Sequence, residues 1–187
     1  KENSELSQTD VNVVNNMVTM RSLYNTATYY YYNGVLNRIS ALAVPKNNIH
    51  YKVSGIDNAV DMCNILAACL KEDSVRTSIL DKYKGVTNES EYDTLIQAEV
   101  NDNFFTVTVI GQNKDMCLEM TSIVEAAIQK KYDEVMSVYS GVTLTKLNEY
   151  YENSMDSDIL EAQKLKKSIF ERSYNDYKTA LSRLTSI

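Results

Sequence analysis

The stretch FFTVTVI, residues Phe104–Ile110, alternates apolar and polar side chains. In a strand, successive side chains point to opposite faces, so Phe105 and Val107 would share one face and the two threonines would lie on the other. Gly111 and Asn113 follow and are typical of a turn. The stretch therefore predicts a strand with one face in the core of a domain.

A helix and a second strand follow this stretch. Apolar residues recur at helical spacing from Lys114, Gly141 ends the pattern, and Val142–Leu147 (VTLTKL) alternates again. This order predicts a βαβ unit, whose crossover is almost always right-handed and whose two strands are parallel. The side chains expected on the core face of the helix are Met116, Met120, Ile123, Val124, Ala127 and Ile128.

Four consecutive tyrosines stand out on the N-terminal side. The segment TATYYYY, Thr26–Tyr32, is rich in β-branched and aromatic residues and ends at Asn33-Gly34, which predicts a strand and a turn. Alternate tyrosines would then face opposite sides of the sheet. We favour a structural role in which one pair enters the core, with a subunit contact and a sugar-stacking platform as alternatives.

Periodicity and capping signals predict the other elements. Ile49–Val53, after a loop at Pro45, predicts a short extended segment. The tail Asp158–Leu184 predicts a long amphipathic helix. The remaining predicted helices are Thr9–Tyr24, Asp57–Leu70, Val75–Lys82 and Ser90–Gln97.

Together these elements predict an α+β fold. We expect a small mixed β-sheet with a right-handed βαβ unit, covered by helices, and a long C-terminal amphipathic helix. A length of 187 residues with 44% hydrophobic content suits one globular domain. We expect residues 1–187 to form that single domain, with a core at residues 24–147 and a helical extension at residues 150–187.

The charge and the apolar runs exclude some classes of partner. A net charge of −6 argues against a surface for nucleic acid or anionic lipid, since both require a basic face. The longest strongly apolar run, Ile65–Leu70, is about a third of the length of a bilayer span. The chain begins at Lys1 without an initiator methionine or a signal segment, which indicates a piece of a longer protein.

The cysteines and the single histidine do not form a recognisable site. Cys63, Cys69 and Cys117 lie among apolar residues, so we expect three free, buried thiols. The first two are separated by about 9 Å along the predicted helix, which is too far for a disulfide. No CxxC or Cys/His cluster occurs, so no metal site is predicted. We expect His50 to be structural or exposed.

The acidic residues offer no stronger candidate. Asp57 and Asp61 are four residues apart, but we expect them to form the solvated first turn of a helix rather than an acid–base pair. Asp156-Ser157-Asp158 lacks the glycine and distal glutamate of a calcium loop, so a helix cap is the better interpretation. No phosphate-loop, nucleophile-elbow or zincin motif occurs. We predict no catalytic, cofactor-binding or metal-ligating residue, no cofactor and no enzyme activity, with an acidic hydrolase as the weakest alternative.

The order of several segments is similar to that in a known protein family. TATYYYYN precedes IDNAVDMCNILAACLKEDSVRTSIL, and EVNDNFFTVTVIGQNKDMCLEMTSIVEAAI follows. Over roughly Tyr24–Leu147 the chain resembles the extracytoplasmic domain of bacterial polysaccharide chain-length determinants, also called polysaccharide co-polymerases. The most distinctive part is Asn101-Asp102 followed by FTVTV, a polar turn and a helix. The proline-rich segment that precedes the second span in that family is not visible, and Glu149–Ile187 departs from its pattern.

The resemblance implies a non-catalytic scaffold that regulates chain length and export of a capsular, exopolysaccharide or O-antigen-type polysaccharide. Members carry a membrane span on each side of this domain, which implies a place in the cell membrane with this domain on the extracytoplasmic side. The implied partners are further copies of the protein in a homo-oligomer, the polysaccharide polymerase and, in Gram-positive members, a cytoplasmic tyrosine kinase, with no nucleic acid. The alternative is an extracytoplasmic sensor or adhesin-like ligand-binding module. We expect copies to meet through Asp57–Lys82 and Asp158–Leu184.

Overall fold

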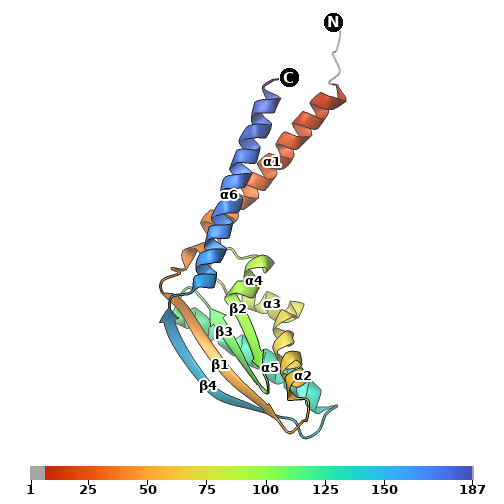
Figure 1. The fold of residues 1–187 in the computed structure, drawn as a ribbon, viewed down its shortest axis with the longest axis vertical. Helices are drawn as coiled ribbons and strands as arrows, with labels where there is room; N and C mark the ends of the chain where they lie inside the picture. Colours follow the sequence, from red (N-terminus) through yellow and green to blue (C-terminus); the bar gives the residue numbers. More distant parts are fainter. Residues whose placement is uncertain (1–6, 187) are drawn as a thin grey trace.

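The computed structural model describes residues 7–186, which form an α+β head and a two-helix stalk (Figure 1). The head comprises residues 34–156. The stalk consists of α1 (Gln8–Asn33) and α6 (Ser157–Leu184). The predicted α+β class and the predicted long C-terminal helix are confirmed.

The sheet of the head has four strands in the order β2-β3-β1-β4. Their bounds are Val44–Ser54 for β1, Ile96–Asn101 for β2, Phe104–Ile110 for β3 and Thr143–Ser154 for β4. All three pairings are antiparallel. The prediction of a mixed sheet is therefore wrong. The predicted strand, helix, strand unit is present as β3, α5 and β4. Its two strands run in the same direction but do not pair, because β1 lies between them and is antiparallel to both.

Four helices belong to the head: α2 (Ala59–Ala68), α3 (Asp73–Leu80), α4 (Glu89–Leu95) and α5 (Lys114–Met136). Short 3-10 helices, η1 (Leu36–Arg38) and η2 (Cys69–Lys71), follow α1 and α2. The order β1-α2-β2-β3-α5-β4 is the βαββαβ arrangement called ferredoxin-like, with α3 and α4 inserted before β2.

The core lies between the sheet and the helices on one of its faces. Ile49, Phe105 and Val107 point to this face and are at most 1% exposed. Tyr51 stacks on Phe105 with 4.8 Å between ring centroids. Most side chains at the alternate positions of β1 and β3, such as His50 and Thr106, point to the other face and are only partly covered. The prediction that Phe104–Ile110 is a strand with one core face is therefore confirmed, and the strand is central in the sheet.

Strand β2 was not predicted, because the sequence pattern continued the preceding helix to Gln97. The helix α4 ends at Leu95, and Ile96 is already paired with Val109 of β3. Ile96 is 5% exposed, so its side chain is buried by this pairing. The predicted extended segments at residues 49–53 and 142–147 are parts of the longer strands β1 and β4.

The predicted strand at Thr26–Tyr32 is wrong, because these residues complete α1. Partly covered side chains in α1 recur at alternating spacings of three and four residues, which is a helical seam. The members of this seam are Val13, Met17, Met20, Tyr24, Ala27 and Tyr31. Packing of this seam against α6 overrides the β-propensity of threonine and tyrosine.

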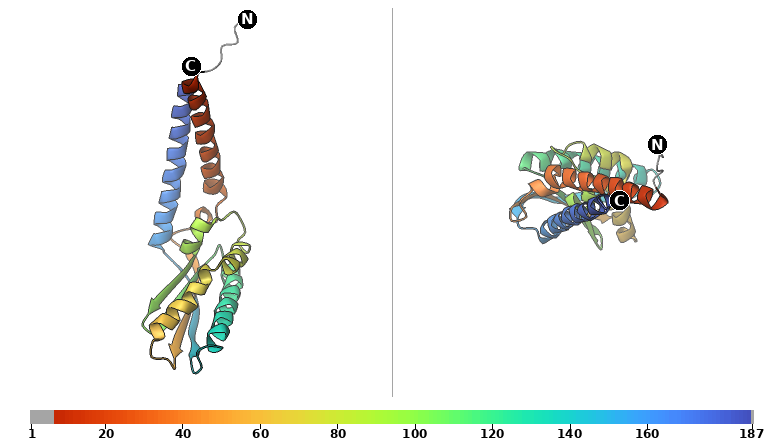
Figure 2. Two further views of the ribbon diagram at one scale, coloured as in Figure 1. Left: turned by 90° about the vertical axis from the view of Figure 1, so that its right-hand side faces the viewer. Right: turned by 90° about the horizontal axis from the view of Figure 1, so that it is seen from above.

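Helix α6 carries a matching seam and runs antiparallel to α1 (Figure 2). Its members are Ile159, Gln163, Lys166, Phe170, Ser173, Tyr177, Ala180 and Leu184. Gln8 and Leu184, at the outer ends of the two helices, lie at the same end of the molecule, away from the head (Figure 1). None of the helices in residues 7–186 is both long and apolar enough to span a membrane.

Candidate functional site

The residues singled out by the sequence as possible acids and ligands do not converge. Asp57 and Asp61 are both exposed at the start of α2, as predicted. Within residues 7–186, no group of three or more His, Cys, Asp and Glu side chains is placed to hold a metal ion.

Asp156 is the N-cap of α6, which confirms the cap interpretation. Its Oδ1 accepts hydrogen bonds from the backbone N–H groups of Asp158, at 2.9 Å, and Ile159, at 3.1 Å. Lys46 Nζ lies 2.8 Å from Asp156 Oδ2, and both side chains are largely buried. Burial by itself would raise the pKa of Asp156, but the hydrogen bonds from Lys46 and the N–H groups outweigh it and lower the pKa.

His50 lies on the sheet face opposite the core. Its Nδ1 is 2.9 Å from Thr106 Oγ1, and its ring stacks on Tyr150 with 5.6 Å between centroids. Asn48, on the same face, accepts a hydrogen bond of 2.8 Å from Thr108. These contacts join neighbouring strands, so the structural role expected for His50 fits its surroundings.

The three cysteines are free and buried, as predicted. Cys63 belongs to α2, Cys69 to η2 and Cys117 to α5. Burial raises the pKa of Cys69 and of Cys117 to about 11. A thiol with a raised pKa is a poor nucleophile near neutral pH, so these side chains act as core residues.

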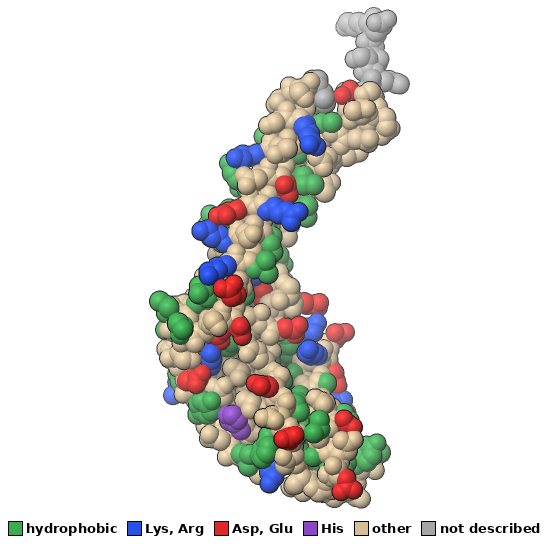
Figure 3. Space-filling view, viewed as in Figure 1, with side chains coloured by type: hydrophobic (Ala, Val, Ile, Leu, Met, Phe, Trp, Pro, Cys, Tyr) green, Lys and Arg blue, Asp and Glu red, His purple; other side chains and the backbone are tan. Residues whose placement is uncertain are grey.

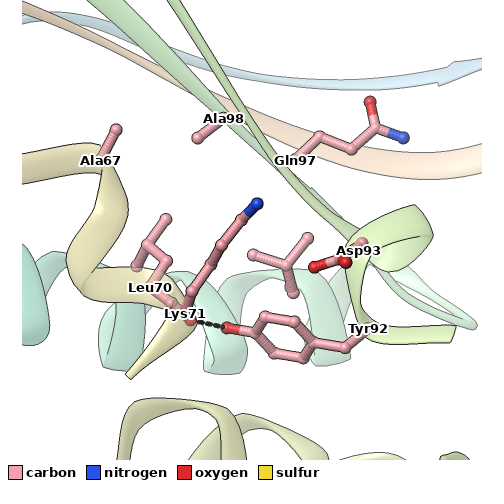
Figure 4. A pocket seen from close by; sticks show the side chains of 8 residues that line it. Ala67, Leu70, Lys71, Tyr92, Asp93, Gln97 and Ala98 are labelled. Carbon is pink, nitrogen blue, oxygen red and sulfur yellow. Dashed lines mark hydrogen bonds between the residues drawn. The ribbon is translucent and has the colours of Figure 1, made fainter. Parts of the chain in front are cut away.

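A pocket of about 250 Å³ lies between η2, α4 and the edge strand β2 (Figure 4). Tyr92 forms one wall, and its hydroxyl donates a 2.6 Å hydrogen bond to the Leu70 carbonyl. Lys71 extends from η2 toward β2, while Asp93 lies near the opposite side. The Tyr92 hydroxyl is already used inside the protein, so the polar groups available to a ligand are the side chains of Lys71, Asp93 and Gln97.

The region where the stalk meets the head brings together residues that are distant in sequence. Lys166 of α6 forms an ion pair with Glu91 of α4, whose side chain is 1% exposed. Thr87 donates a 2.9 Å hydrogen bond to the other oxygen of Glu91. The ammonium of Lys166 also lies 5.8 Å from the ring centroid of Tyr30. This buried ion pair ties α6 to the head.

The end of α1 is tied to the head as well. The backbone of Val35 donates a 2.8 Å hydrogen bond to Val86, and the N–H of Val86 donates to Asn33. A Cβ at Gly34 would collide with the carbonyl of Tyr30 and lie 3.2 Å from Glu91 Oε1. Glycine therefore permits the close approach of α1 and α4 at this position.

Aromatic rings fill the seam of the stalk. Phe170 stacks on Tyr31 at 4.6 Å and on Tyr24 at 6.1 Å, and Tyr177 stacks on Tyr24 at 5.6 Å. Tyr32 meets the edge of Phe170 and stays 64% exposed. The tyrosine cluster is therefore split, with some rings in the seam between two helices and others half-exposed.

A cavity of about 290 Å³ and a groove of about 700 Å³ lie at this region. The junction cavity lies between α1, α4 and α6, and Tyr30, Ser90 and Lys166 line it. The junction groove lies between the end of α1, residues 37–41 and the first turns of α6. Tyr32, Gln163 and Lys167 are among its lining residues.

Sequence reasoning did not find Glu91 or Gln163, and it did not pair the two stalk helices. The sequence did contain a signal for this helix pair: apolar and aromatic residues recur at spacings of three and four in α1 and in α6, and in α1 this spacing continues through the tyrosines. Two surfaces were expected to join copies. In the first, α2 packs on the sheet and α3 packs on α5; in the second, α6 packs on α1. Their role in assembly stays a prediction.

The chain matches no model of a known protein family and no curated protein sequence at a significant level.

Proposed function

We propose that this protein is a membrane-anchored scaffold that regulates the chain length of a cell-surface polysaccharide. The supporting observation is the stalk: α1 and α6 run antiparallel from the head and end on the same side of the molecule. Spans that continued outward from both helices would enter one membrane surface from the same side. The head would then stand about 39 Å from that surface, given the 26 residues of α1 and the rise of a helix.

The polysaccharide part of the proposal comes from the resemblance of residues 24–147 to chain-length determinants. In that role the head performs no chemistry, and its shape and spacing guide the polymerase that extends the chain. Implied partners are other copies of this protein, the polymerase and, as in Gram-positive members of that family, a cytoplasmic tyrosine kinase. The head would lie on the extracytoplasmic side of the cell membrane.

The proposal is tested in cells that make the full-length protein. We expect deletion of its gene to leave the sugar composition of the surface polysaccharide unchanged and to shorten or randomise its length distribution on gels. Labelling of a cysteine introduced at exposed Leu42 by a membrane-impermeant reagent should place the head outside the cell. An unchanged length distribution, or a head that reacts only after lysis, would contradict the proposal.

An extracytoplasmic sensor is the second candidate, and the junction cavity favours it. A ligand bound between α1, α4 and α6 would contact both head and stalk, and could change the angle between them. The full reading frame separates the two candidates. Two spans that bracket the chain support the scaffold, whereas one span followed by a kinase or methyl-accepting domain supports the sensor.

A further inference from the structure

The junction groove has a composition unlike the rest of this acidic chain. Three segments build it: the end of α1, residues 37–41 and the first turns of α6. Of the described residues that line it, two are lysines, Lys164 and Lys167, and none is acidic. The whole chain carries a net charge of −6, whereas the only charged side chains among these lining residues are cationic.

The framework of the groove is fixed by hydrogen bonds. Gln163 Nε2 donates to the carbonyl oxygens of Leu36, at 3.0 Å, and Ile39, at 2.6 Å. Asn37 Nδ2 donates to the Tyr31 carbonyl at 3.0 Å. These bonds join all three segments, so the groove exists before a ligand binds and ordering it costs little on binding.

Its polar and aromatic groups remain available to a ligand. Lys164 and Lys167 are each 63% exposed, and their ion pairs with Glu161 and Glu171 are exposed contacts of 3.3 Å and 3.9 Å. Exposed pairs of this kind contribute little, so an incoming anion can replace them. Tyr32 is 64% exposed beside the lysines, which leaves a ring surface free.

We propose that the junction groove binds an acidic saccharide, with Lys164 and Lys167 on its carboxylate groups and Tyr32 against the apolar side of a sugar ring. Ammonium groups form charge-assisted hydrogen bonds with carboxylates, and tyrosine offers an apolar ring with a polar end. That such a saccharide reaches the groove in the cell depends on the proposed function. The complementarity of charge and ring surface depends only on the groove.

The position of the groove favours a glycan over a lipid headgroup. Lys167 lies about 26 Å along the helix axis from Leu184, given the rise of a helix. In an anchored protein the groove would therefore face the space above the membrane, where a growing surface polysaccharide passes. Figure 3 shows Lys and Arg side chains along the stalk, while acidic side chains are more frequent on the visible face of the head.

The test uses trigalacturonate as the acidic probe, a neutral galactose trisaccharide of similar size and short-chain polyphosphate, titrated into the chain by calorimetry at physiological salt. We expect trigalacturonate to bind and the other two to bind at least about tenfold more weakly. The double variant Lys164→Gln/Lys167→Gln should raise the Kd of trigalacturonate about tenfold. The matched control Lys130→Gln/Lys178→Gln removes the same charge elsewhere and should leave the Kd unchanged.

A second pair of variants tests the aromatic contact. Tyr32→Ala should weaken binding, while Tyr29→Ala, which changes a half-exposed tyrosine that does not line the groove, should not. The proposal would be overturned if trigalacturonate did not bind, or if polyphosphate bound equally tightly. It would also be overturned if both double variants lost affinity for trigalacturonate to the same extent. Chain-length control in cells that survives such a result would leave the scaffold function standing, so the two failures are distinguishable.

Discussion

At the residue scale, the least expected feature is the pair formed by Glu91 and Lys166. Both lie where stalk and head meet, and Glu91 is almost completely buried. Taking two charges out of water costs several kcal/mol, which their attraction offsets only when both are present. The pair therefore fixes how the stalk is oriented relative to the head, and it adds little net stability.

Lys166→Met should destabilise the protein by about 3 kcal/mol or more, because it leaves the Glu91 carboxylate buried without a partner. The double variant Glu91→Gln/Lys166→Met should recover most of that loss, since no charge then remains. Urea unfolding monitored by circular dichroism measures both free energies. Lys164→Met, at an exposed position of the same helix, is the control and should change the free energy little. Equal effects of Lys166→Met and Lys164→Met would show that the buried pair is not formed.

Asp156 should make part of the stability depend on pH. Its pKa in the folded protein is lowered, so its contribution is present above the unfolded pKa of about 3.9 and is lost as pH falls through the folded pKa. The difference in unfolding free energy between the wild type and Asp156→Asn should therefore be constant from pH 7 to about pH 5 and shrink below about pH 4. Thermal unfolding across this range measures it. A difference that grows on acidification would contradict the lowered pKa.

At the element scale, periodic segments with local turn signals were predictable. The strand Phe104–Ile110 and the helix after it were found because their alternation and helical spacing match burial in the structure. The tyrosine segment was mistaken for a strand because its propensity is local, whereas its helix is stabilised by Phe170, about 140 residues away. The prediction that β3 and β4 pair in parallel was wrong for a similar reason. A crossover sets the relative direction of two strands, but it does not reveal that a third strand, β1, lies between them. The junction cavity and the junction groove could not be predicted, because each combines the end of α1 with residues of α6 that are more than 120 positions away.

The aromatic seam should decide whether the two stalk helices stay together. Phe170→Ala removes the ring that contacts Tyr24, Tyr31 and Tyr32, and should cost about 2 kcal/mol of stalk stability, less than a fully buried phenylalanine. Amide hydrogen exchange should then accelerate in α1 and remain unchanged in β3. Leu165→Ala, at a 62% exposed position of α6, is the control. Unchanged exchange in α1 would show that the stalk does not depend on this ring.

At the scale of the whole molecule, the head is the compact part and the stalk is thin. Helix α1 contains no fully buried residue, and α6 contains only Ile159 and Ala180. Leu165 and Ile169 lie on α6 with more than half of their surface exposed. These apolar side chains are available for contact with another copy.

We expect the 187-residue chain to be a monomer or weak oligomer in solution. Each copy carries a charge of −6, and in solution no membrane anchor raises the local concentration of copies. Anchoring in a membrane raises the effective concentration, so the full-length protein should form a closed, stable assembly. Light scattering in mild detergent measures its mass. The double variant Leu165→Glu/Ile169→Glu should disperse the assembly, and Leu42→Glu, at a 75% exposed position of the head, should not. A monomeric full-length protein with normal polymer length would contradict assembly as the basis of control.

The repeating seam of the stalk also makes its length adjustable in discrete steps. One heptad contributes about 10 Å of helix, so removing seven residues from each of α1 and α6 would lower the head by that amount and keep the remaining seam in phase. Removing two residues from each helix would turn the seam side chains to the opposite side and separate the helices. If the proposed anchoring holds, the distance between the head and the lipid surface can change only in steps of one heptad. Evolution could then change that distance without altering a single contact inside the head.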